Sequence, residues 1–359
     1  MKILITTPGL EFGGAERVLS VLSNQWVSMG HEVSLFLTVS KEKPAYDLDE
    51  RVEVCYCSRE TYGVGVAGVI RGIRLHAKKI KADIVLSFMQ DVAALTAIAL
   101  LGMGVPLIYS ERNDPTKTNT RKIDRIFRII VENRAAGFVF QTEGAKRFFK
   151  ERVQTKSQVI LNPMDAERFP VHDFSCEKDE IVSVGRLEPQ KNFPLLLNAF
   201  SIIEGKFPQI QLCVYGEGSC REALEAQIKD LGLDGRVSLK GAVRDIQTYT
   251  RNAKVFAMTS DYEGLPNALL EALAMGLPCV STDCSPGGAR TLIEDGTSGC
   301  VVPCGDVEAV ASALERLLSD RAYAQVLGQN ALNIRQRVSS KKIANQWLQL
   351  FYKTAKRRK

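Results

Sequence analysis

The chain has 359 residues, of which 45% are hydrophobic and 25% charged, a length that suits two domains of about 150–180 residues. This composition excludes a disordered chain, and 27 Gly and 13 Pro residues exclude collagen-like and low-complexity chains. The net charge of +6 is too small for a dedicated nucleic-acid-binding protein.

The first half alternates short apolar runs with amphipathic stretches, which predicts βαβ units and a mostly parallel sheet. The predicted strands are Ile3–Thr6, Glu32–Leu37, Val52–Tyr56, Ile84–Phe88, Leu107–Tyr109 and Phe138–Phe140. The predicted helices are Ala15–Met29, Val66–Ile80 and Ile123–Arg134. The first strand is too short an apolar run for a signal peptide, no uncharged segment is long enough to span a bilayer, and the nine scattered cysteines need no disulfides. We therefore expect a cytoplasmic protein.

The polar segment 165–178 interrupts this alternation and predicts a linker, after which the alternation resumes. The predicted strands are Ile181–Val184, Gln211–Tyr215, Val237–Leu239, Val255–Met258, Cys279–Ser281 and Gly299–Val302. The predicted helices are Leu195–Ile203, Arg221–Lys229, Ala268–Met275, Val307–Leu318 and Ser340–Lys356. We predict an α/β protein of two Rossmann-like, doubly wound domains facing across a cleft. Their ranges are 1–165 and 166–338, and a C-terminal helix within 339–359 crosses back to the first domain.

The strongest motif follows the strand 254–259, where Gly264-Leu265-Pro266-Asn267 leads into a helix. Pro266 suits the first helical position, so that free N–H groups at the positive helix end form a cradle for a diphosphate. Glu263 lies at the mouth of this loop. Glu271 lies five residues past Pro266, about 7–8 Å along the helix axis. The structural alternative is that Glu263 is a loop charge and Glu271 faces solvent.

Three further glycine motifs follow predicted strands. Gly185 lets the backbone approach a ligand, and Arg186 and Lys191 offer a guanidinium and an ammonium to one anion. Gly13-Gly14, before the first helix, frees space for a phosphate at its N-terminus, and Gly216 begins another glycine turn. Surface cations and tight βα turns are the alternatives.

In this order, the Gly13–Arg17, Gly185–Asn192, Gly216–Gly218 and Glu263–Glu271 motifs resemble the retaining GT-B glycosyltransferases of family 4 over nearly the whole chain. The resemblance is closest to bacterial enzymes that extend glycans on polyprenyl-diphosphate carriers. It implies that the following residues bind substrate: Gly13, Gly14, Glu16, Arg112, Gly185, Gly216, Gly264, Leu265, Pro266, Asn267 and Glu271.

The resemblance also implies individual roles. Arg186 and Lys191 would hold the donor diphosphate, Glu263 would contact the transferred sugar, Glu271 would bind the ribose hydroxyls, and Gly14 would approach the diphosphate from the first domain. Relatives often have a histidine near the sugar, after the fifth strand. Here Arg112 occupies that place, where a cation can stabilise phosphate or sugar oxygens but does not reproduce the histidine's contact.

The implied reaction transfers a hexosyl or N-acetylhexosaminyl unit, with retention, from a nucleotide diphosphate sugar (a UDP-sugar by resemblance) to a polyprenyl-diphosphate-linked saccharide. Arg186, Lys191 and helix N-termini would stabilise the leaving diphosphate without a metal or other cofactor. The alternatives are an epimerase-like sugar-nucleotide enzyme and a non-catalytic peripheral membrane protein with the same fold.

Other motifs argue weakly for cofactors. Gly63-Val64-Gly65-Val66-Ala67-Gly68 matches the dinucleotide fingerprint, but the acid about 20 residues on, Asp83, starts the next strand rather than ending it. Asp47-Leu48-Asp49 imitates a metal-binding D-x-D but lies in a polar connection. Cysteines 279–304 have no CxxC spacing for zinc.

Positive charge concentrates in one segment and in the tail. Residues 1–170 carry 24 basic and 19 acidic side chains, residues 171–350 carry 18 and 22, and the last nine residues carry five and none. Segment 112–156 holds five acids and twelve bases, namely Arg112, Lys117, Arg121, Lys122, Arg125, Arg128, Arg134, Lys146, Arg147, Lys150, Arg152 and Lys156. Within it, Ile123, Ile126, Phe127 and Ile130 recur at helical spacing. Either they pack on the domain core, or this face meets anionic headgroups at the inner face of the cytoplasmic membrane, helped by the tail Lys356–Lys359. Nucleic acid is not an expected partner, because no aromatic stacking platform accompanies the charge.

Overall fold

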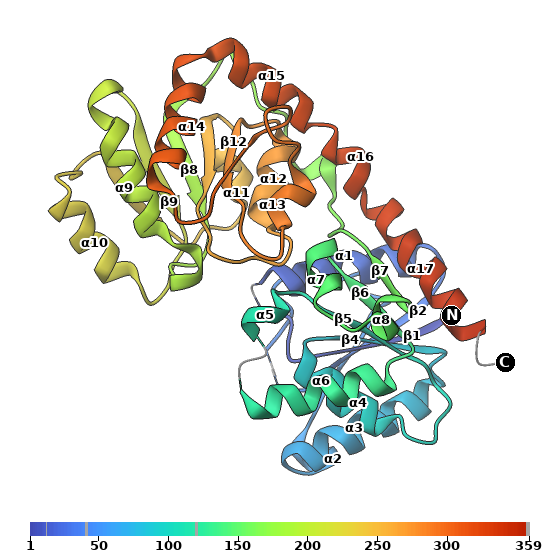
Figure 1. Ribbon diagram of the computed structural model, residues 1–359. Helices are drawn as coiled ribbons and strands as arrows, with labels where there is room; N and C mark the ends of the chain where they lie inside the picture. The colour runs from blue at the N-terminus through green and yellow to red at the C-terminus, as the bar shows by residue number, and fades with distance from the viewer. Residues whose placement is uncertain (12, 40–41, 119–120, 357–359) are drawn as a thin grey trace. The chain divides into compact units, whose positions relative to one another are not determined.

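The structure is a computed structural model that describes residues 1–11, 13–39, 42–118 and 121–356; the predicted tail residues Arg357, Arg358 and Lys359 lie outside this range. The chain forms two compact units. Unit 1 comprises Met1–Asp165 and Val338–Lys359, and unit 2 comprises Ala166–Arg337. Each unit has a parallel sheet with helices packed on it (Figure 1). The predicted fold class, two Rossmann-like α/β domains, is confirmed.

Unit 1 has a seven-stranded parallel sheet in the order β3-β2-β1-β4-β5-β6-β7. Its strands are β1 (Lys2–Thr7), β2 (Glu32–Leu37), β3 (Glu53–Tyr56), β4 (Ile84–Phe88), β5 (Leu107–Ser110), β6 (Gly137–Phe140) and β7 (Ser157–Val159). Strand β7 was not predicted, because three residues with only one apolar side chain carry no recognisable pattern. The strand order reverses between β1 and β4, the type of position where α/β sheets bind ligands.

Helices cover both faces of this sheet. They are α1 (Gly14–Ser28), α2 (Arg59–Tyr62), α3 (Gly65–Ile80), α4 (Gln90–Ala99), α5 (Pro115–Thr118), α6 (Lys122–Arg134), α7 (Glu143–Arg147), α8 (Glu151–Gln154) and α17 (Ser340–Lys356). The last helix joins unit 1 through aromatic packing: Trp26 of α1 lies 5.2 Å from Phe351 between ring centroids. The indole N–H of Trp26 also donates to the Ala344 carbonyl at 3.1 Å. The chain therefore returns to the first unit at its C-terminal end.

Unit 2 has a six-stranded parallel sheet in the order β10-β9-β8-β11-β12-β13. The strands are β8 (Lys178–Val184), β9 (Gln211–Tyr215), β10 (Val237–Gly241), β11 (Ala253–Met258), β12 (Cys279–Thr282) and β13 (Cys300–Val302). The helices are α9 (Phe193–Ile203), α10 (Arg221–Asp230), α11 (Ile246–Thr250), α12 (Asn267–Met275), α13 (Gly288–Leu292), α14 (Val307–Ser319), α15 (Arg321–Ala331) and α16 (Ile334–Val338), which ends in unit 1. Helices α11, α13, α15 and α16 were not predicted.

The apolar pattern of β8 explains how the sheet of unit 2 positions its polar loops. The strand starts with exposed charged residues, and its second half is buried. Ile181 packs in one core cluster with Leu196 and Phe200 of α9. This packing fixes the carboxyl end of the strand, from which the next residues extend. Among the described residues, no helix is both long enough and apolar enough to cross a bilayer.

Candidate functional site

Loops at the carboxyl ends of three neighbouring strands form one polar edge of the unit 2 sheet. Gly185 and Arg186 follow β8, Gly216 follows β9, and the loop 259–266 follows β11. These loops come from motifs that are far apart in the sequence. Parallel strands bring them together because all of their carboxyl ends lie at the same edge. We call this set of loops the unit 2 edge.

An ion pair between Lys191 and Glu263 links two loops of the unit 2 edge. Lys191 Nζ donates to Glu263 Oε1, and the hydroxyl of Ser260 donates to the same oxygen at 2.8 Å. The side chains of Lys191 and Glu263 are only 17% and 9% exposed. Each charge has lost most of its water and therefore depends on its partner. Both residues were predicted to belong to the site, but their pairing was not.

Further hydrogen bonds hold the same two loops in register. The Asp261 N–H donates to the Gln190 carbonyl at 2.9 Å. The Gln190 side-chain amide donates to the Tyr262 carbonyl at 2.8 Å, and the Asn192 amide donates to Asp261 Oδ1 at 2.7 Å. The ammonium and the carboxylate of the ion pair thus sit on a braced support.

The glycines of the unit 2 edge have a packing reason in the structure. Gly216 has a φ of +151°, and a Cβ there would lie 1.8 Å from the Gly185 carbonyl oxygen. A Cβ at Gly218 would lie 2.4 Å from the Leu187 carbonyl oxygen. Side chains at 216 and 218 would therefore push the loop after β9 away from the loop after β8.

Helix α12 begins beside this loop with one correction to the predicted boundary. Pro266 is the N-cap residue, in extended conformation, and Asn267 is the first helical residue. Pro266 was predicted to be the first residue of the helix. The fixed φ of proline suits the N-cap position as well as the first helical position, so the sequence does not separate the two. Gly264 and Leu265 are buried just before the cap. Glu271 is only 8% exposed, so the alternative in which it faces solvent is wrong.

At the carboxyl edge of the unit 1 sheet, Arg112 is held by neutral groups. Its Nη2 donates to Asn162 Oδ1 at 2.5 Å, and its Nη1 donates to the Ser110 hydroxyl at 3.4 Å. The guanidinium carbon lies 4.6 Å from the centroid of the Phe88 ring. Gln141 donates to the same Asn162 oxygen at 2.5 Å. We call these five residues the Arg112 cluster.

The electrostatic environment of the cluster is that of a desolvated cation. Burial lowers the pKa of Arg112 to about 9, while the charges of Glu111 and Glu16 act in the opposite direction. Burial also raises the pKa of Glu111, although the Tyr109 hydroxyl donates to its carboxylate at 2.6 Å. Within the described residues, Arg112 Nε has no hydrogen-bond partner. The cluster therefore combines a positive charge with a buried N–H donor that has no partner among the described residues.

The predicted Gly13-Gly14 motif belongs to the same edge of unit 1. Gly13 is the extended N-cap of α1, Gly14 is its first residue, and the Tyr46 hydroxyl donates to the Gly13 carbonyl at 3.1 Å. The Glu16 carboxylate folds back so closely that a Cβ at Gly13 would lie 2.1 Å from Glu16 Oε2. Since the charge of Glu16 acts on Arg112, the two predicted residues lie near one another. Phe12 of this motif lies outside the described residues.

Sequence reasoning missed the polar residues that hold the charged ones. Asn162 and Gln141 hold Arg112, and Ser260 and Gln190 hold the ion pair of unit 2. Gln141 comes directly after β6, and Ser260 lies two residues beyond β11. A search for polar residues just beyond each strand would have found these two.

The motifs that imitate cofactor sites serve packing and local ion pairing in the structure. Gly63 ends α2, Gly65 begins α3, and a Cβ at Gly68 would lie 2.5 Å from the Gly63 carbonyl oxygen. These glycines therefore pack a tight helix–helix turn. Asp49 forms an ion pair with Arg51 at 2.7 Å. Across the described parts of the chain, no group of three or more His, Cys, Asp or Glu is placed to hold a metal ion.

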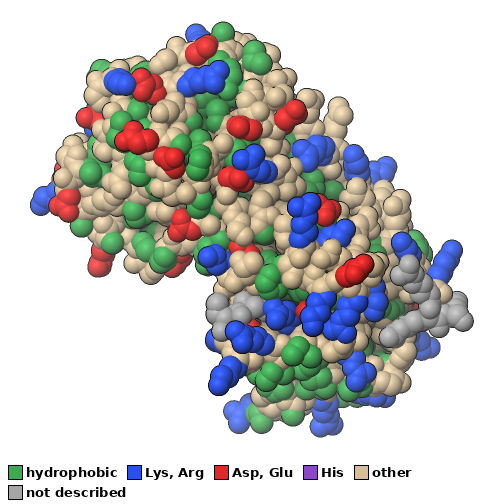
Figure 2. Space-filling view, in the orientation of Figure 1, with side chains coloured by type: hydrophobic (Ala, Val, Ile, Leu, Met, Phe, Trp, Pro, Cys, Tyr) green, Lys and Arg blue, Asp and Glu red, His purple; other side chains and the backbone are tan. Residues whose placement is uncertain are grey.

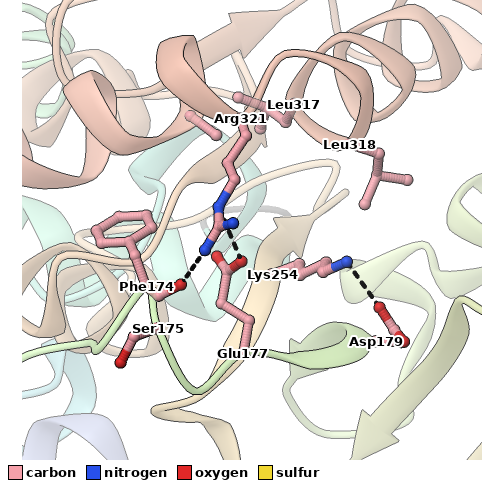
Figure 3. A pocket seen from close by; sticks show the side chains of 9 residues that line it. Phe174, Ser175, Glu177, Asp179, Lys254, Leu317, Leu318 and Arg321 are labelled. Atoms are coloured by element: carbon pink, nitrogen blue, oxygen red, sulfur yellow. Dashed lines mark hydrogen bonds and ion pairs between the residues drawn. The ribbon is translucent and has the colours of Figure 1, made fainter.

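A cavity in unit 2 lies at the opposite end of its sheet (Figure 3). Arg321 of α15 donates to the Phe174 carbonyl and lies 3.8 Å from Glu177. Lys254 pairs with Asp179 at 2.6 Å, and both residues lie near the amino ends of their strands. The charges around this cavity are satisfied by one another. We therefore assign the candidate site to the carboxyl edges.

Comparison with known proteins gives two family models in tandem. The model described as "Glycosyltransferase Family 4" matches residues 12–168, and the model "Glycosyl transferases group 1" matches residues 165–334. The chain is 29% identical, over 98% of its length and 98% of the relative's, to a Campylobacter jejuni protein named as an alpha-1,4-N-acetyl-D-galactosaminyltransferase acting on GalNAc-alpha-(1->4)-GalNAc-alpha-(1->3)-diNAcBac-PP-undecaprenol. It is 25% identical, over 93% of its length and 95% of the relative's, to an uncharacterized glycosyltransferase of Haemophilus influenzae.

The same fold occurs in solved structures. Anabaena HepE, crystallised in complex with UDP, superposes with a TM-score of 0.83 at 21% identity, covering 98% of this chain and 100% of HepE. The two parallel sheets, the tandem family matches and these relatives together define the class: the chain is a glycosyltransferase of the GT-B fold.

Proposed function

We propose that this glycosyltransferase moves a hexosyl or N-acetylhexosaminyl unit, with retention of configuration, from a UDP-sugar to a polyprenyl-diphosphate-linked saccharide. The observation that carries the proposal is the Lys191–Glu263 ion pair at the unit 2 edge, beside the start of α12. Two Campylobacter jejuni relatives are named as transferases that act on undecaprenol-linked saccharides, which supports the acceptor class.

The proposed donor site uses the exchangeable charge of the ion pair. Arg186, which is exposed, and Lys191 bind the diphosphate, and the first N–H groups of α12 add positive potential. Lys191 then exchanges its contact with Glu263 for one with phosphate, and Glu263 turns to the sugar hydroxyls. Glu271 binds the ribose. UDP in the HepE structure supports a uridine donor.

The proposed mechanism rests on stabilising the leaving diphosphate while the sugar gains oxocarbenium character. Lys191 and Arg186 neutralise the charge that develops on the leaving group, and no carboxylate nucleophile or metal is invoked. A phosphate oxygen of the donor takes the acceptor proton. At the unit 1 edge, Arg112 stabilises phosphate or sugar oxygens, and Gly13, Gly14 and Glu16 line the same region.

The proposed acceptor is attached to a lipid, so we also propose that the protein works peripherally at the inner face of the cytoplasmic membrane. Charge supports this: nine of the twelve basic residues in segment 112–156 are exposed, compared with two of its five acids.

The experiment is transfer from a panel of nucleotide sugars to a short polyprenyl-diphosphate disaccharide in the presence of EDTA, with the anomeric configuration read by NMR. We expect one UDP-sugar to be used, with retention and without metal. Loss of activity in EDTA contradicts the metal-free mechanism, and inverted product contradicts retention. Interconversion of the sugar nucleotide without acceptor identifies an epimerase. A biological phenotype that survives Arg186→Ala and Lys191→Ala identifies a non-catalytic protein.

A further inference from the structure

Helix α6 of unit 1 has an unusual burial pattern. Ile123, Ile126 and Ile129 are 43%, 52% and 55% exposed, whereas Asp124 and Glu132 of the same helix are buried. Amphipathic helices normally do the reverse. Single exposed apolar residues are common, but three large ones along one helix beside buried carboxylates need a physical cause.

The buried carboxylates are accounted for by their ion pairs. Arg121 pairs with Asp124 at 2.8 Å, and Glu132 lies 3.6 Å from Arg128 and 3.2 Å from Arg152. These pairs remove negative charge from the surface of the segment. No contact of this kind explains the exposed isoleucines. Of the residues predicted to face the core, Phe127 and Ile130 are half-buried against it, whereas Ile123 and Ile126 are exposed.

The apolar surface continues beyond α6 to the segment between α7 and α8. Phe148 is 36% exposed, and the guanidinium carbon of Arg128 lies 5.3 Å from its ring centroid. Figure 2 shows hydrophobic side chains grouped in the part of unit 1 where α6 lies, with Lys and Arg around them. We call Ile123, Ile126, Ile129 and Phe148 the α6 face. The exposed cations of α6 and the α7–α8 segment are Arg121, Lys122, Arg125, Arg134, Arg147, Lys150 and Arg152.

This combination fits an anionic lipid surface better than other partners. Apolar side chains surrounded by flexible cations suit a bilayer interface, where the chains enter the headgroup boundary and the cations meet phosphates. An RNA partner would need aromatic side chains for base stacking, and the α6 face offers only Phe148. A protein partner would need acidic residues to match the cations, whereas the phosphates of anionic lipids supply that charge over any area.

We propose that the α6 face is a bilayer-docking surface that inserts its isoleucines between the headgroups of anionic phospholipids. The inference deepens the proposed function, on which it rests for a membrane-bound acceptor. It adds the surface, its orientation toward the lipid and the lipid class. Insertion distinguishes it from attraction of a generally basic protein, because insertion depends on the isoleucines.

The experiment measures binding to vesicles of phosphatidylcholine and phosphatidylglycerol in a roughly 7:3 ratio, compared with phosphatidylcholine alone. The test variant is Ile126→Ser/Ile129→Ser. The matched control is Ile202→Ser/Val326→Ser, which changes two exposed apolar residues of unit 2. We expect the test variant to lose at least about tenfold in partitioning and the control to remain unchanged. Thermal unfolding of both variants confirms that they are folded.

Insertion is read directly from a tryptophan placed in the α6 face. In Ile126→Trp, brominated phosphatidylcholine within the anionic vesicles should quench the added emission, because the native Trp26 and Trp347 are fully buried. In Val326→Trp it should not. Equal quenching at the two positions, or equal vesicle binding by the two serine variants, overturns the proposal. Salt-sensitive binding to an RNA oligonucleotide with no binding to vesicles also overturns it, in favour of nucleic acid.

Failure of this inference is distinguishable from failure of the proposed function. Transfer to a short-chain, water-soluble acceptor does not require a bilayer, so Ile126→Ser/Ile129→Ser should retain its wild-type rate there. It should lose rate only on acceptor embedded in anionic vesicles. Soluble transfer without vesicle binding contradicts the docking surface alone. Vesicle binding without transfer to any acceptor contradicts the proposed function alone.

Discussion

The carboxyl edges of the two sheets hold their cations in different ways. In unit 2, Lys191 is paired with the carboxylate of Glu263. In unit 1, Arg112 is held by the side-chain oxygens of Asn162 and Ser110 and by the Phe88 ring. The same fold therefore provides one cation that is paired with a carboxylate, which we propose is exchangeable, and one that is held by neutral groups.

The difference decides what an incoming anion has to do. At Lys191, a phosphate bound as we propose would have to displace Glu263, and the released carboxylate would then be available to the sugar. At Arg112, burial has already removed much of the water, and Nε has no partner within the described residues. An anion there meets a charge that is already desolvated, which strengthens the interaction. We infer that unit 2 is organised for exchange and unit 1 for fixed positioning.

The largest effect is expected when the positive charge of Lys191, the cation paired with Glu263, is removed. Lys191→Gln should lower kcat by roughly 100- to 1,000-fold, the range seen when one charge-stabilising group is removed from a transition state. Lys191→Arg, which keeps the charge, should recover part of that loss. The measurement is steady-state transfer, with thermal unfolding to confirm folding. The control is Lys206→Ala, which breaks an exposed ion pair with Glu315 in the same unit. Equal rates for Lys191→Gln and the control would refute the assignment.

The second prediction concerns removal of the positive charge of Arg112, the cation that neutral groups hold. Arg112→Met should lower turnover by about 10- to 100-fold without destabilising the protein, because removal of the desolvated charge offsets the lost hydrogen bonds to Asn162 and Ser110. The matched control is Arg236→Met in unit 2. Arg236 pairs with Glu204 at 2.5 Å, so its loss strands a carboxylate and should destabilise the protein more while sparing turnover. Chemical denaturation and transfer assays read both quantities. The reverse pattern would contradict fixed positioning.

Most of the strands could be predicted, because each is a short apolar run and the sequence alternates these runs with amphipathic stretches. Glu32–Leu37, Ile84–Phe88 and Gln211–Tyr215 occupy the predicted ranges without change, since each is a short, mostly buried apolar run. Strand β7 could not be predicted, because three residues are too few to carry a pattern. Helix α15 was missed although its buried residues Ala324, Leu327 and Ala331 recur at helical spacing.

Within the candidate site, only the charged residues could be predicted from the sequence. Lys191, Glu263 and Arg112 stand out as charges just after strands, but their partners are uncharged or distant in sequence. Asn162, for example, lies 50 residues from Arg112. The burial pattern of α6 could not be predicted either. A charged residue such as Asp124 is expected at the surface, but its ion pair with Arg121 allows it to be buried.

The third prediction concerns a variant in which Arg112 of unit 1 gains a carboxylate partner, as Lys191 of unit 2 has. Asn162→Asp places a carboxylate beside Arg112, which should raise the pKa of Arg112 from about 9 and weaken its hold on an incoming anion. In the wild-type protein, kcat/KM should fall as pH rises above about 9 because Arg112 loses its charge. In Asn162→Asp the fall should move to higher pH, with a rate at neutral pH lowered by about tenfold. A pH–rate profile measures both effects. An alkaline limb that does not move would place it on another group.

Stability should follow the same titration with a definite sign. The pKa of Arg112 in the folded protein lies below its ordinary value of 12.5, so the unfolded chain binds the proton more tightly. The cost of the buried charge is therefore fully present below pH 9 and is relieved as pH rises toward 12.5. Arg112→Met should remove this dependence, which denaturation midpoints between these pH values would detect.

The smallest expected effect uses native thiols to locate the donor. Cys304 is exposed, and its Sγ lies 3.8 Å from the Ser260 and Asp261 carbonyl oxygens of the unit 2 edge. Cys176, which is also exposed, precedes β8 at the other end of the sheet and serves as the internal control. At a donor concentration ten times its Kd, alkylation of Cys304 should slow by up to about tenfold, because only the unbound fraction reacts. Burial raises the pKa of Cys284 to about 12, so that thiol should remain unlabelled. Mass spectrometry separates the three sites. Equal protection of Cys304 and Cys176 would mean that the donor does not bind at this edge, and that the exchangeable ion pair there serves stability alone.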